Sequence, residues 1–191
     1  MTAQETASAY DALAPAYDQQ LAGDQWMRAV LWSRYARLFR SGQWVLDVSC
    51  GTGIDALFLA SRGIRVTGID VSEGMIAQLQ AKAAGELLSG MIDARVMDLA
   101  EIGGLPNGFD GIISAFAGLS TTPNLATFAA DAARLLRPGG HIMLHMLNRT
   151  SLWEWLGKVK RGDLAMARHL GSSGERDFVI GGRAIRRHSQ G

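Results

Sequence analysis

The chain has 191 residues, which is enough for one ordinary domain with a core of its own. Hydrophobic residues make up 48% of it and charged residues 19%, a composition that excludes a disordered tail. The single cysteine, Cys50, excludes a disulfide framework and a zinc site built on several thiolates, so no metal is expected. The sequence shows no leader segment and no apolar run of ~18 residues, so we expect a cytoplasmic protein that contacts no membrane.

The net charge of +1 hides an uneven distribution along the chain. Residues 1–133 contain 8 Lys and Arg against 14 Asp and Glu, whereas residues 134–191 contain 11 against 4. The simpler interpretation is that residues 134–191 present a solvated basic face, which complements the acidic residues 1–133. A nucleic-acid surface is the alternative, but the chain lacks interleaved aromatic residues and a recognisable binding module. We therefore expect no nucleic-acid partner.

Apolar and β-branched runs alternate with helical patterns along most of the chain. An amphipathic helix is expected over 25–40, followed by strands over 44–49, 65–70, 94–99, 109–115 and 141–147. The helices between them cover 54–62, 72–88 and 124–137, with Gly63 as a C-cap, Ser72 as an N-cap and Pro138 as a stop. This alternation predicts an α/β fold with a mostly parallel sheet of five strands. Beyond it, the sequence favours a surface helix or lid over 152–170 and a candidate hairpin over 178–185.

The segment Asp47-Val-Ser-Cys-Gly-Thr-Gly53 joins the first strand to the helix that follows it. In an open parallel sheet, ligands sit beyond the carboxyl ends of the strands, where this turn lies. Gly51 and Gly53 lack a Cβ, so the backbone can approach a ligand closely, and the free N–H groups of the next helix favour a carboxylate or phosphate. The spacing Gly51-x-Gly53-x-x-Ala56 also fits a shortened dinucleotide fingerprint, so a nicotinamide cofactor remains open at this point.

Two more acidic residues end the next two expected strands. Asp70 comes 19 residues after Gly51 and can accept both hydroxyls of a ribose, which NAD and an adenosyl ligand would each offer. Asp98 could accept a hydrogen bond from the exocyclic amine of an adenine. Each could instead cap a helix or lie on the surface. Acids at three successive strand ends nevertheless favour one shared site.

The motifs resemble, in order and spacing over residues 8–148, those of the class I S-adenosylmethionine-dependent methyltransferases. They read Val45-Leu-Asp-Val-Ser-Cys-Gly-Thr-Gly53, Val66-Thr-Gly-Ile-Asp-Val-Ser-Glu-Gly-Met75, Val96-Met-Asp-Leu99, Phe109-Asp-Gly-Ile-Ile-Ser114 and Leu135-Leu-Arg-Pro-Gly-Gly-His-Ile-Met-Leu144. The resemblance implies a Rossmann-like three-layer sandwich that binds S-adenosylmethionine and methylates an oxygen or nitrogen of a small molecule. A cofactor-binding module without catalysis is the alternative. An NAD-dependent oxidoreductase is more distant, because Asp47 and the Leu-Leu-Arg-Pro-Gly-Gly junction discriminate against it.

The resemblance also implies roles for individual residues. The positions that would contact the cofactor are Asp47, Ser49, Cys50, Gly51, Gly53, Asp70, Val71, Met75, Asp98, Leu99, Ser114 and Ala115. Asp47 would take the ammonium group, and the turn 49–53 would cradle the methionine end. Asp70 would hold the ribose hydroxyls, and Val71 and Met75 would pack on the adenine. Asp98 would accept a hydrogen bond from the adenine amine, and the backbone N–H of Leu99 would donate to the adenine ring. Ser114 and Ala115 would face the sulfonium and the methyl group.

Residues 1–40 resemble the N-terminal helical lid of small-molecule members, placed over a cofactor-binding core at 41–148. In this lid, Tyr17 and an arginine such as Arg34 would close over the cofactor. Residues 149–191 would form a basic helix on the substrate side and the candidate hairpin. Arg149, Lys158 and Lys160 suggest an anionic substrate, a hypothesis based on charge alone.

Two features depart from the family pattern. Ser49 stands where the family usually has glycine, and a serine fits there if its φ is negative. Its hydroxyl could then bond the cofactor carboxylate. The sequence also stops after the candidate hairpin, without the helix and last strand of the family sheet. This would leave an unpaired edge and open apolar surface, so we expect a truncated product or another closure such as a homodimer.

Methyl transfer from a sulfonium is an in-line displacement in which the cofactor supplies the activated carbon. The protein must hold the nucleophile in line with the methyl group and keep water out. A hydroxyl or ammonium nucleophile also needs a base, and His145 near the end of the fifth strand is a candidate. A hydrogen-bonded histidine packed under a helix is the simpler interpretation, so no catalytic residue is assigned. We expect Cys50 to fill space in the turn rather than to react.

Overall fold

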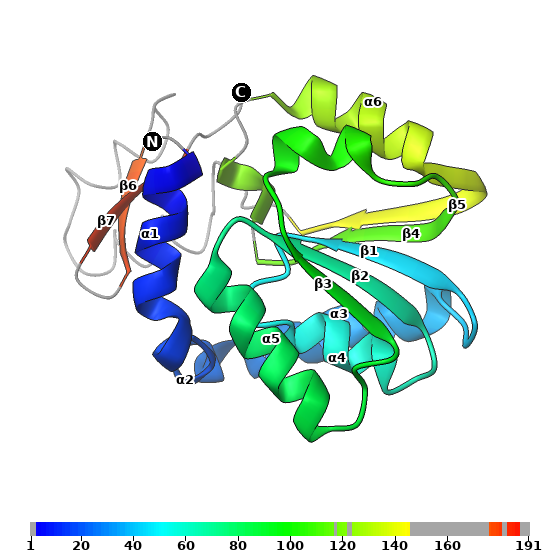
Figure 1. Ribbon diagram of the computed structural model, residues 1–191, viewed down its shortest axis with the longest axis horizontal. Coiled ribbons are helices and arrows are strands. Elements are labelled where there is room, and N and C mark those ends of the chain that lie inside the picture. Colours follow the sequence, from blue (N-terminus) through cyan, green and yellow to red (C-terminus); the bar gives the residue numbers. More distant parts are fainter. Residues whose placement is uncertain (1–2, 117, 122–123, 146–175, 181–182, 188–191) are drawn as a thin grey trace, which may run out of the picture.

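The computed structural model describes residues 3–116, 118–121, 124–145, 176–180 and 183–187 (Figure 1). The strands are β1 (Trp44–Val48), β2 (Arg65–Asp70), β3 (Ile92–Val96), β4 (Phe109–Ser114), β5 (Leu136–Leu144), β6 (Arg176–Ile180) and β7 (Arg183–Arg187). The α-helices are α1 (Ala3–Leu13), α2 (Tyr17–Gln20), α3 (Gln25–Leu38), α4 (Ile54–Ala60), α5 (Glu73–Gly85) and α6 (Leu125–Leu135). Short 3-10 helices are η1 (Ala14–Ala16), η2 (Ala22–Asp24), η3 (Leu99–Gly104) and η4 (Gly118–Thr121). The expected helix over 152–170 and the basic residues Arg149, Lys158 and Lys160 lie outside the described residues.

The centre of the fold is a parallel sheet in the order β3-β2-β1-β4-β5. β1 is the middle strand, with Val45 in register with Val66 on one side and Gly111 on the other. All of β4 and nearly all of β1 are buried, as expected for parallel strands that are covered on both faces. In Figure 1, α3, α4 and α5 cover one face of the sheet and α6 covers the other. The predicted α/β three-layer sandwich with five parallel strands is confirmed.

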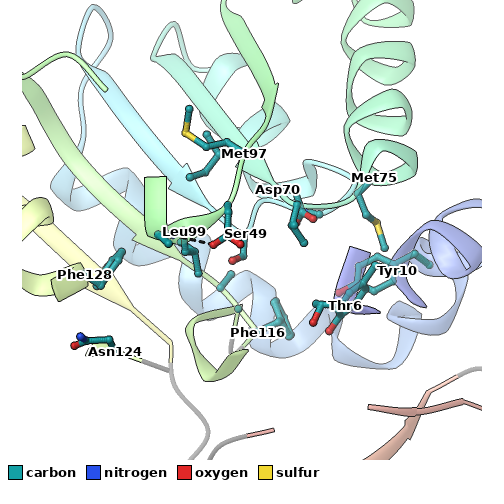
Figure 2. A pocket seen from close by; sticks show the side chains of 18 of the residues that line it. Thr6, Tyr10, Ser49, Asp70, Met75, Met97, Leu99, Phe116, Asn124 and Phe128 are labelled. Atoms are coloured by element: carbon teal, nitrogen blue, oxygen red, sulfur yellow. Dashed lines mark hydrogen bonds between the residues drawn. The ribbon is translucent and has the colours of Figure 1, made fainter. Parts of the chain in front are cut away.

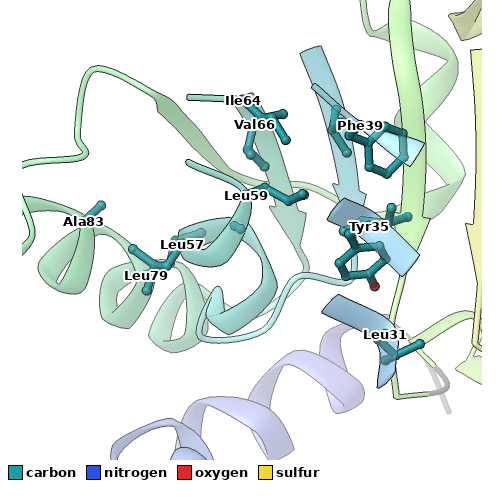
Figure 3. Close-up of a cluster of buried hydrophobic side chains, with 12 residues drawn as sticks. Leu31, Tyr35, Phe39, Leu57, Leu59, Ile64, Val66, Leu79 and Ala83 are labelled. Atoms are coloured by element: carbon teal, nitrogen blue, oxygen red, sulfur yellow. The ribbon is translucent and has the colours of Figure 1, made fainter. Parts of the chain in front are cut away.

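Each face of the sheet has its own apolar core. The core beneath α3, α4 and α5 is drawn in Figure 3 and contains Leu31, Tyr35, Phe39, Val45, Ala56, Leu57, Leu59, Ile64, Val66, Leu79, Ala83 and Ile113. The core on the opposite face, under α6 and η3, contains Leu46, Val48, Ile69, Ile102, Leu105, Phe109, Ile112, Leu119, Phe128, Ala132 and Leu135. Neighbouring residues of β1 alternate between the two cores, which fixes the register of the sheet.

Local signals in the sequence set several helix ends as predicted. The Ser72 hydroxyl caps α5 and accepts a hydrogen bond from the backbone N–H of Met75 at 3.1 Å. Gly63 follows α4 with a φ of +76°, the left-handed conformation of a C-cap glycine. The expected boundaries of the third strand and of the helix before β5 are wrong by a few residues. β3 ends at Val96, so Asp98 lies beyond the strand as the N-cap of η3.

The junction between α6 and β5 also differs from the prediction. α6 ends at Leu135, and β5 starts at once at Leu136 and runs through Pro138. The pairing with β4 shifts between Phe109 and Gly111, which accommodates the extra residues of the Pro-Gly-Gly segment as an irregularity. Among the described strands β5 lies at the edge of the sheet, where a proline without an N–H is tolerated.

The residues before α3 lie at the carboxyl edge of the sheet, whereas α3 itself packs on one face. α1 and η1 pack on α5, where Ala9, Leu13 and Ala14 form a small core with Met75. The predicted C-terminal hairpin is present as the antiparallel pair β6–β7, separate from the central sheet and beside α1 (Figure 1). Its expected turn at Gly181-Gly182 lies outside the described residues. Within the described ranges, no helix has the length and apolar character needed to cross a bilayer.

The contact between α3 and β4 depends on Gly111. A Cβ added there would lie 2.1 Å from Cε1 and 2.5 Å from Cζ of the buried Phe39 ring. We therefore expect Gly111→Ala to lower the free energy of unfolding by about 1–3 kcal/mol through overpacking. The measurement is urea unfolding followed by circular dichroism.

Gly85→Ala is the matched control, because a Cβ at Gly85 in α5 would meet nothing within 4 Å. It should leave stability unchanged or raise it by up to about 1 kcal/mol. Equal stability of the two variants would contradict the packing assigned to Gly111.

Candidate functional site

A cavity of about 440 Å³ opens at the carboxyl ends of β1, β2 and β4 (Figure 2). It is lined by Thr6, Tyr10, Tyr17, Ser49, Gly51, Ile69, Asp70, Val71, Met75, Met97, Asp98, Leu99, Ala100, Ala115, Phe116, Gly118, Asn124, Thr127 and Phe128. Figure 2 shows Thr6 and Tyr10 of the lid on one side and Phe128 of α6 on the other. The cavity therefore lies at the sheet edge at which the sequence predicts a ligand.

A second, smaller cavity of about 30 Å³ adjoins the first. The residues that line both are Tyr17, Ser49, Gly51, Ala115 and Phe116. The smaller cavity adds a charged group of residues, Arg28, Asp47 and Asp55, together with Cys50. The two cavities form one site with a wide, mostly apolar part and a narrow, charged part.

The turn between β1 and α4 shapes the floor of this site. Ser49, Gly51 and Gly53 all have positive φ, at +57°, +54° and +78°. A Cβ at Gly53 would lie 2.1 Å from Cδ1 of Leu79, so only glycine lets this side chain of α5 lie against the turn. The backbone N–H of Cys50 donates to the carbonyl of Ile69 at 2.9 Å, which joins the turn to β2.

The conformation of Ser49 differs from the sequence-based expectation. The prediction that serine fits with a negative φ is wrong, because Ser49 has the left-handed conformation for which glycine is the usual residue. Gly118 makes room for the side chain: a Cβ at Gly118 would lie only 2.5 Å from Cβ of Ser49. The missing side chain at position 118 thus compensates for the extra one at position 49.

Asp70 stands at the end of β2, facing the larger cavity (Figure 2). Its Oδ2 accepts from the backbone N–H of Gly51 at 2.9 Å, and its Oδ1 accepts from that of Ser72 at 3.0 Å. Burial raises the pKa of this carboxyl, although the two backbone bonds act against the shift. Each oxygen keeps a lone pair, so the carboxylate can accept both hydroxyls of a ribose.

Asp47, in β1, is buried beneath the turn with a relative exposure of 2%. Within the described part of the chain, its Oδ2 has no hydrogen-bond partner. Burial raises the pKa of Asp47 well above its usual range, and the charge of Asp55 adds to the rise, whereas Arg28 opposes it. A buried carboxylate oxygen without a partner is costly, and a bound cation would relieve it.

Arg28 of α3 is the cation nearest this carboxylate cluster in the described structure. Its Nη1 donates to Asp55 Oδ2 at 2.5 Å, and Trp32 Nε1 donates to the other oxygen at 2.7 Å. The guanidinium lies 4.3 Å over the ring of Phe116. Arg34, expected to close over the cofactor, is exposed and lines neither cavity. The arginine at the site is therefore Arg28, on the buried face of the same helix.

The lid is joined to the floor by carboxylates of its own. Asp11 Oδ1 accepts from the Ser72 hydroxyl at 2.5 Å and from the Gly74 N–H at 2.8 Å. Asp18 accepts from Lys82 at 2.8 Å and from the Thr52 hydroxyl in the turn. Burial acts to raise the pKa of Asp18, but the Lys82 and Thr52 hydrogen bonds outweigh it and lower the pKa. These bonds hold Tyr17 against the turn.

The structure places the remaining predicted residues as follows. Val71, Met75, Leu99 and Ala115 line the larger cavity, as does Asp98, whose Oδ1 accepts from the Ala100 N–H at 2.9 Å. Burial raises the pKa of the Cys50 thiol, which disfavours the reactive thiolate and fits a space-filling role. Ser114, Gly53 and His145 are not among the residues that line either cavity. His145 contacts Phe116 instead.

Sequence reasoning missed ten residues that line the larger cavity, namely Thr6, Tyr10, Ile69, Met97, Ala100, Phe116, Gly118, Asn124, Thr127 and Phe128. Tyr10 belongs to the segment Tyr10–Asp18 that resembles a lid, so its position could have been suspected. Phe116 carries no signal, because its place depends on a backbone turn with a φ of +50°. Asn124, expected as the first residue of a helix, is instead the N-cap of α6, and its Oδ1 accepts from the Thr127 N–H at 3.0 Å.

These features define a class of protein: an open parallel sheet with a cavity at its carboxyl edge, where one carboxylate faces the cavity and another is buried beside it. The methyltransferase domain family matches residues 45–140, half of the chain. The chain is 31% identical over 144 residues to a ubiquinone biosynthesis O-methyltransferase of Xanthomonas oryzae pv. oryzae (strain PXO99A), covering 75% of this chain and 59% of that protein. It is 36% identical over 112 residues to the enzyme of that name from Dechloromonas aromatica (strain RCB), covering 57% and 46%. The chain belongs to the class I S-adenosylmethionine-dependent methyltransferases, and it spans about half the length of these curated relatives.

Solved structures share the fold. The complex named DhpI-SAM-HEP has a TM-score of 0.64 at 22% identity and covers 98% of this chain and 81% of its own. The [4+2]-cyclase SpnF has a TM-score of 0.68 at 23% identity and covers 93% and 76%. Because the sequence identities are only 22% and 23%, the structural similarity shows that the fold is shared and nothing more.

The buried charge of Asp47 makes stability depend on pH. Because the folded pKa is raised, stability falls as pH rises from the usual 3.8 towards the raised value, and it then stays level. We expect Asp47→Asn to raise the free energy of unfolding by about 1–3 kcal/mol at neutral pH, with the gain vanishing at acidic pH. Urea titrations at a series of pH values measure this.

Asp93→Asn is the control, since Asp93 is exposed and pairs with Arg95 at 2.6 Å on the surface. Its effect should stay below about 1 kcal/mol. A loss of stability in Asp47→Asn would mean that the carboxylate has a stabilising partner.

Proposed function

We propose that this chain binds S-adenosylmethionine across the two cavities and transfers its methyl group to a small molecule. The observation that carries the proposal is the buried Oδ2 of Asp47, which has no hydrogen-bond partner among the described residues, beside the carboxylate of Asp70, which faces the larger cavity. A cofactor with an ammonium group at one end and a ribose in the middle satisfies both. The pyrophosphate of a nicotinamide cofactor would meet the negative charge of these carboxylates at the same turn, so an oxidoreductase is disfavoured.

The chemistry of the residues fits each part of this cofactor. Asp47 would accept from the ammonium group, and the guanidinium of Arg28 would hold the adjacent carboxylate with the N–H groups that Asp55 leaves available. Asp70 would accept from the ribose, and the apolar side chains Val71 and Leu99 would pack against the adenine. When bound, the cofactor supplies an electrophilic methyl carbon on a sulfonium.

The protein's contribution is to orient the reactants and to exclude water. The lid residue Tyr17 lies over the turn, with its Cε1 3.6 Å from the position of a Cβ at Gly51. Ala115 lines the junction of the two cavities and leaves space for the reacting carbon. Holding the nucleophile in line with that carbon is the main source of rate acceleration available to this site.

For the substrate, we propose a small organic molecule with an oxygen acceptor. The similarity to ubiquinone biosynthesis O-methyltransferases supports oxygen, and the aromatic side chains Tyr10, Phe116 and Phe128 in the cavity favour a flat ring. Nitrogen remains the alternative acceptor atom. Mass spectrometry of the products would show which of the two atoms carries the methyl group. A cytoplasmic location, a homodimer and the absence of nucleic-acid and membrane partners stay predictions.

Binding of the cofactor and its product tests the proposal. We expect calorimetry to show saturable binding of S-adenosylmethionine and S-adenosylhomocysteine, weakened about tenfold or more in Asp70→Asn, because the variant loses charge-assisted hydrogen bonds without a change in size. Asp93→Asn should bind as the wild type does. Binding of NADH with none of the sulfonium cofactor would refute the assignment, and binding without methylation of any phenol would indicate a binding module.

The pH dependence of affinity gives a second test of Asp70. Protonated Asp70 cannot accept two hydroxyls, so affinity for S-adenosylhomocysteine should fall as pH decreases through the raised pKa of this carboxyl. The Asp70→Asn variant should show a shallower pH dependence, to which only the other buried acids contribute. Identical pH profiles for the two proteins would exclude Asp70 from the binding site.

A further inference from the structure

Phe116 is held in an unusual backbone conformation at the junction of the two cavities. Its φ is +50°, which bulky residues rarely adopt and which persists only when surrounding contacts enforce it. Phe116 lines both the wide and the narrow cavity, and Figure 2 shows its side chain among the lining residues. Whatever holds this backbone therefore affects the shape of the site where the two cavities meet.

His145 supplies the contact. Its Nδ1 accepts a hydrogen bond from the backbone N–H of Phe116 at 3.1 Å. The two rings meet edge to face, with centroids 5.6 Å apart and planes at 83°. The backbone N–H of His145 donates to the carbonyl of Ser114 at 2.8 Å, so the histidine is itself anchored to the end of β4.

This bond is compatible with only one tautomer of the His145 ring. A backbone N–H can only donate, so Nδ1 carries no proton, and in the neutral ring the proton lies on Nε2. Neither nitrogen can then accept a proton from a substrate unless the bond to Phe116 breaks. The arrangement therefore opposes the general-base role for which the sequence made His145 a candidate.

The position of Phe116 also affects Arg28 in the narrow, charged cavity. The Phe116 ring lies beneath the Arg28 guanidinium, 4.3 Å from its centroid. Arg28 is also bonded to Asp55, so the ring and that carboxylate together fix the direction of the guanidinium. A shift of the Phe116 backbone would move the wall of the wide cavity and release one of the two contacts of Arg28.

We propose that His145 is a positioning residue: its unprotonated Nδ1 holds Phe116 in the left-handed conformation that closes the cofactor site and orients Arg28. The inference rests on the proposed function for its effect on affinity. The contact between His145 and Phe116 can be tested without any ligand.

Three variants separate positioning from proton transfer. His145→Asn keeps an acceptor oxygen close to the position of Nδ1 but cannot serve as a general base, whereas His145→Leu removes the acceptor. His141→Leu is the matched control, because His141 lies exposed within β5, four residues before His145. Circular dichroism would first establish that all three proteins are folded.

The ligand-free readouts are the 15N shift of His145 Nδ1 and the hydrogen exchange of the Phe116 amide, both by NMR. We expect an unprotonated Nδ1 in the wild type, and an amide protected in the wild type, His145→Asn and His141→Leu but not in His145→Leu. A protonated Nδ1, or an amide that exchanges equally in all four proteins, would overturn the proposal.

Calorimetry with S-adenosylhomocysteine gives the functional readout. His145→Leu should bind about three- to tenfold more weakly, the effect of losing one hydrogen bond, and His145→Asn should bind close to the wild type. If His145→Asn binds well but abolishes methylation, the histidine is a base and the positioning role is refuted. If no protein binds, the cofactor assignment fails, while the NMR measurements still decide the role of His145 in holding Phe116.

Discussion

The turn after β1 is the constraint on which the rest of the site depends. Three residues with positive φ, Ser49, Gly51 and Gly53, bend the chain so tightly that the Leu79 side chain of α5 lies against Gly53, the residue before α4. The same bend brings the Gly51 N–H to within 2.9 Å of Asp70 on the neighbouring strand. The lid is fastened to this turn through Asp18, and both cavities have it as their floor. A change in the turn would therefore disturb fold, lid and ligand site together.

The site also buries carboxylates, which lowers the stability of the folded protein. Asp47 and Asp55 lie in low-dielectric surroundings with Arg28 as their cation in the described structure, and Asp47 keeps an oxygen without a partner. Such a group lowers the stability of the free protein, but it is preorganised for a positively charged ligand. The buried carboxylates thus lower the stability of the free protein and favour recognition of a cation. Binding of a cation should restore part of the stability that is lost through burial. Asp70, which faces the larger cavity, extends the same preference towards hydroxyl donors.

The sequence could predict those parts of the fold and site that follow from local chemistry. The spacing from Gly51 placed Asp70 at the end of a strand, because strand and helix lengths in such units vary little. The conformation of Ser49 could not be predicted, since it depends on the missing side chain of Gly118, far away along the chain. The choice of Arg28 over a neighbouring arginine depends on which face of α3 meets Asp55, which the helical pattern alone does not reveal. Long-range packing, rather than propensity, decided each of these points.

The proposed function requires that the carboxyl edge of the sheet binds the cofactor. The most direct measurement is a titration of the 15N-labelled chain with S-adenosylhomocysteine, followed by the amide resonances. We expect shifts concentrated at Gly51, Ser72, Leu99 and Phe116, with no change at Gly42, which lies at the opposite end of the sheet before β1. Shifts of equal size at Gly42, or a spectrum unchanged at saturating ligand, would contradict it.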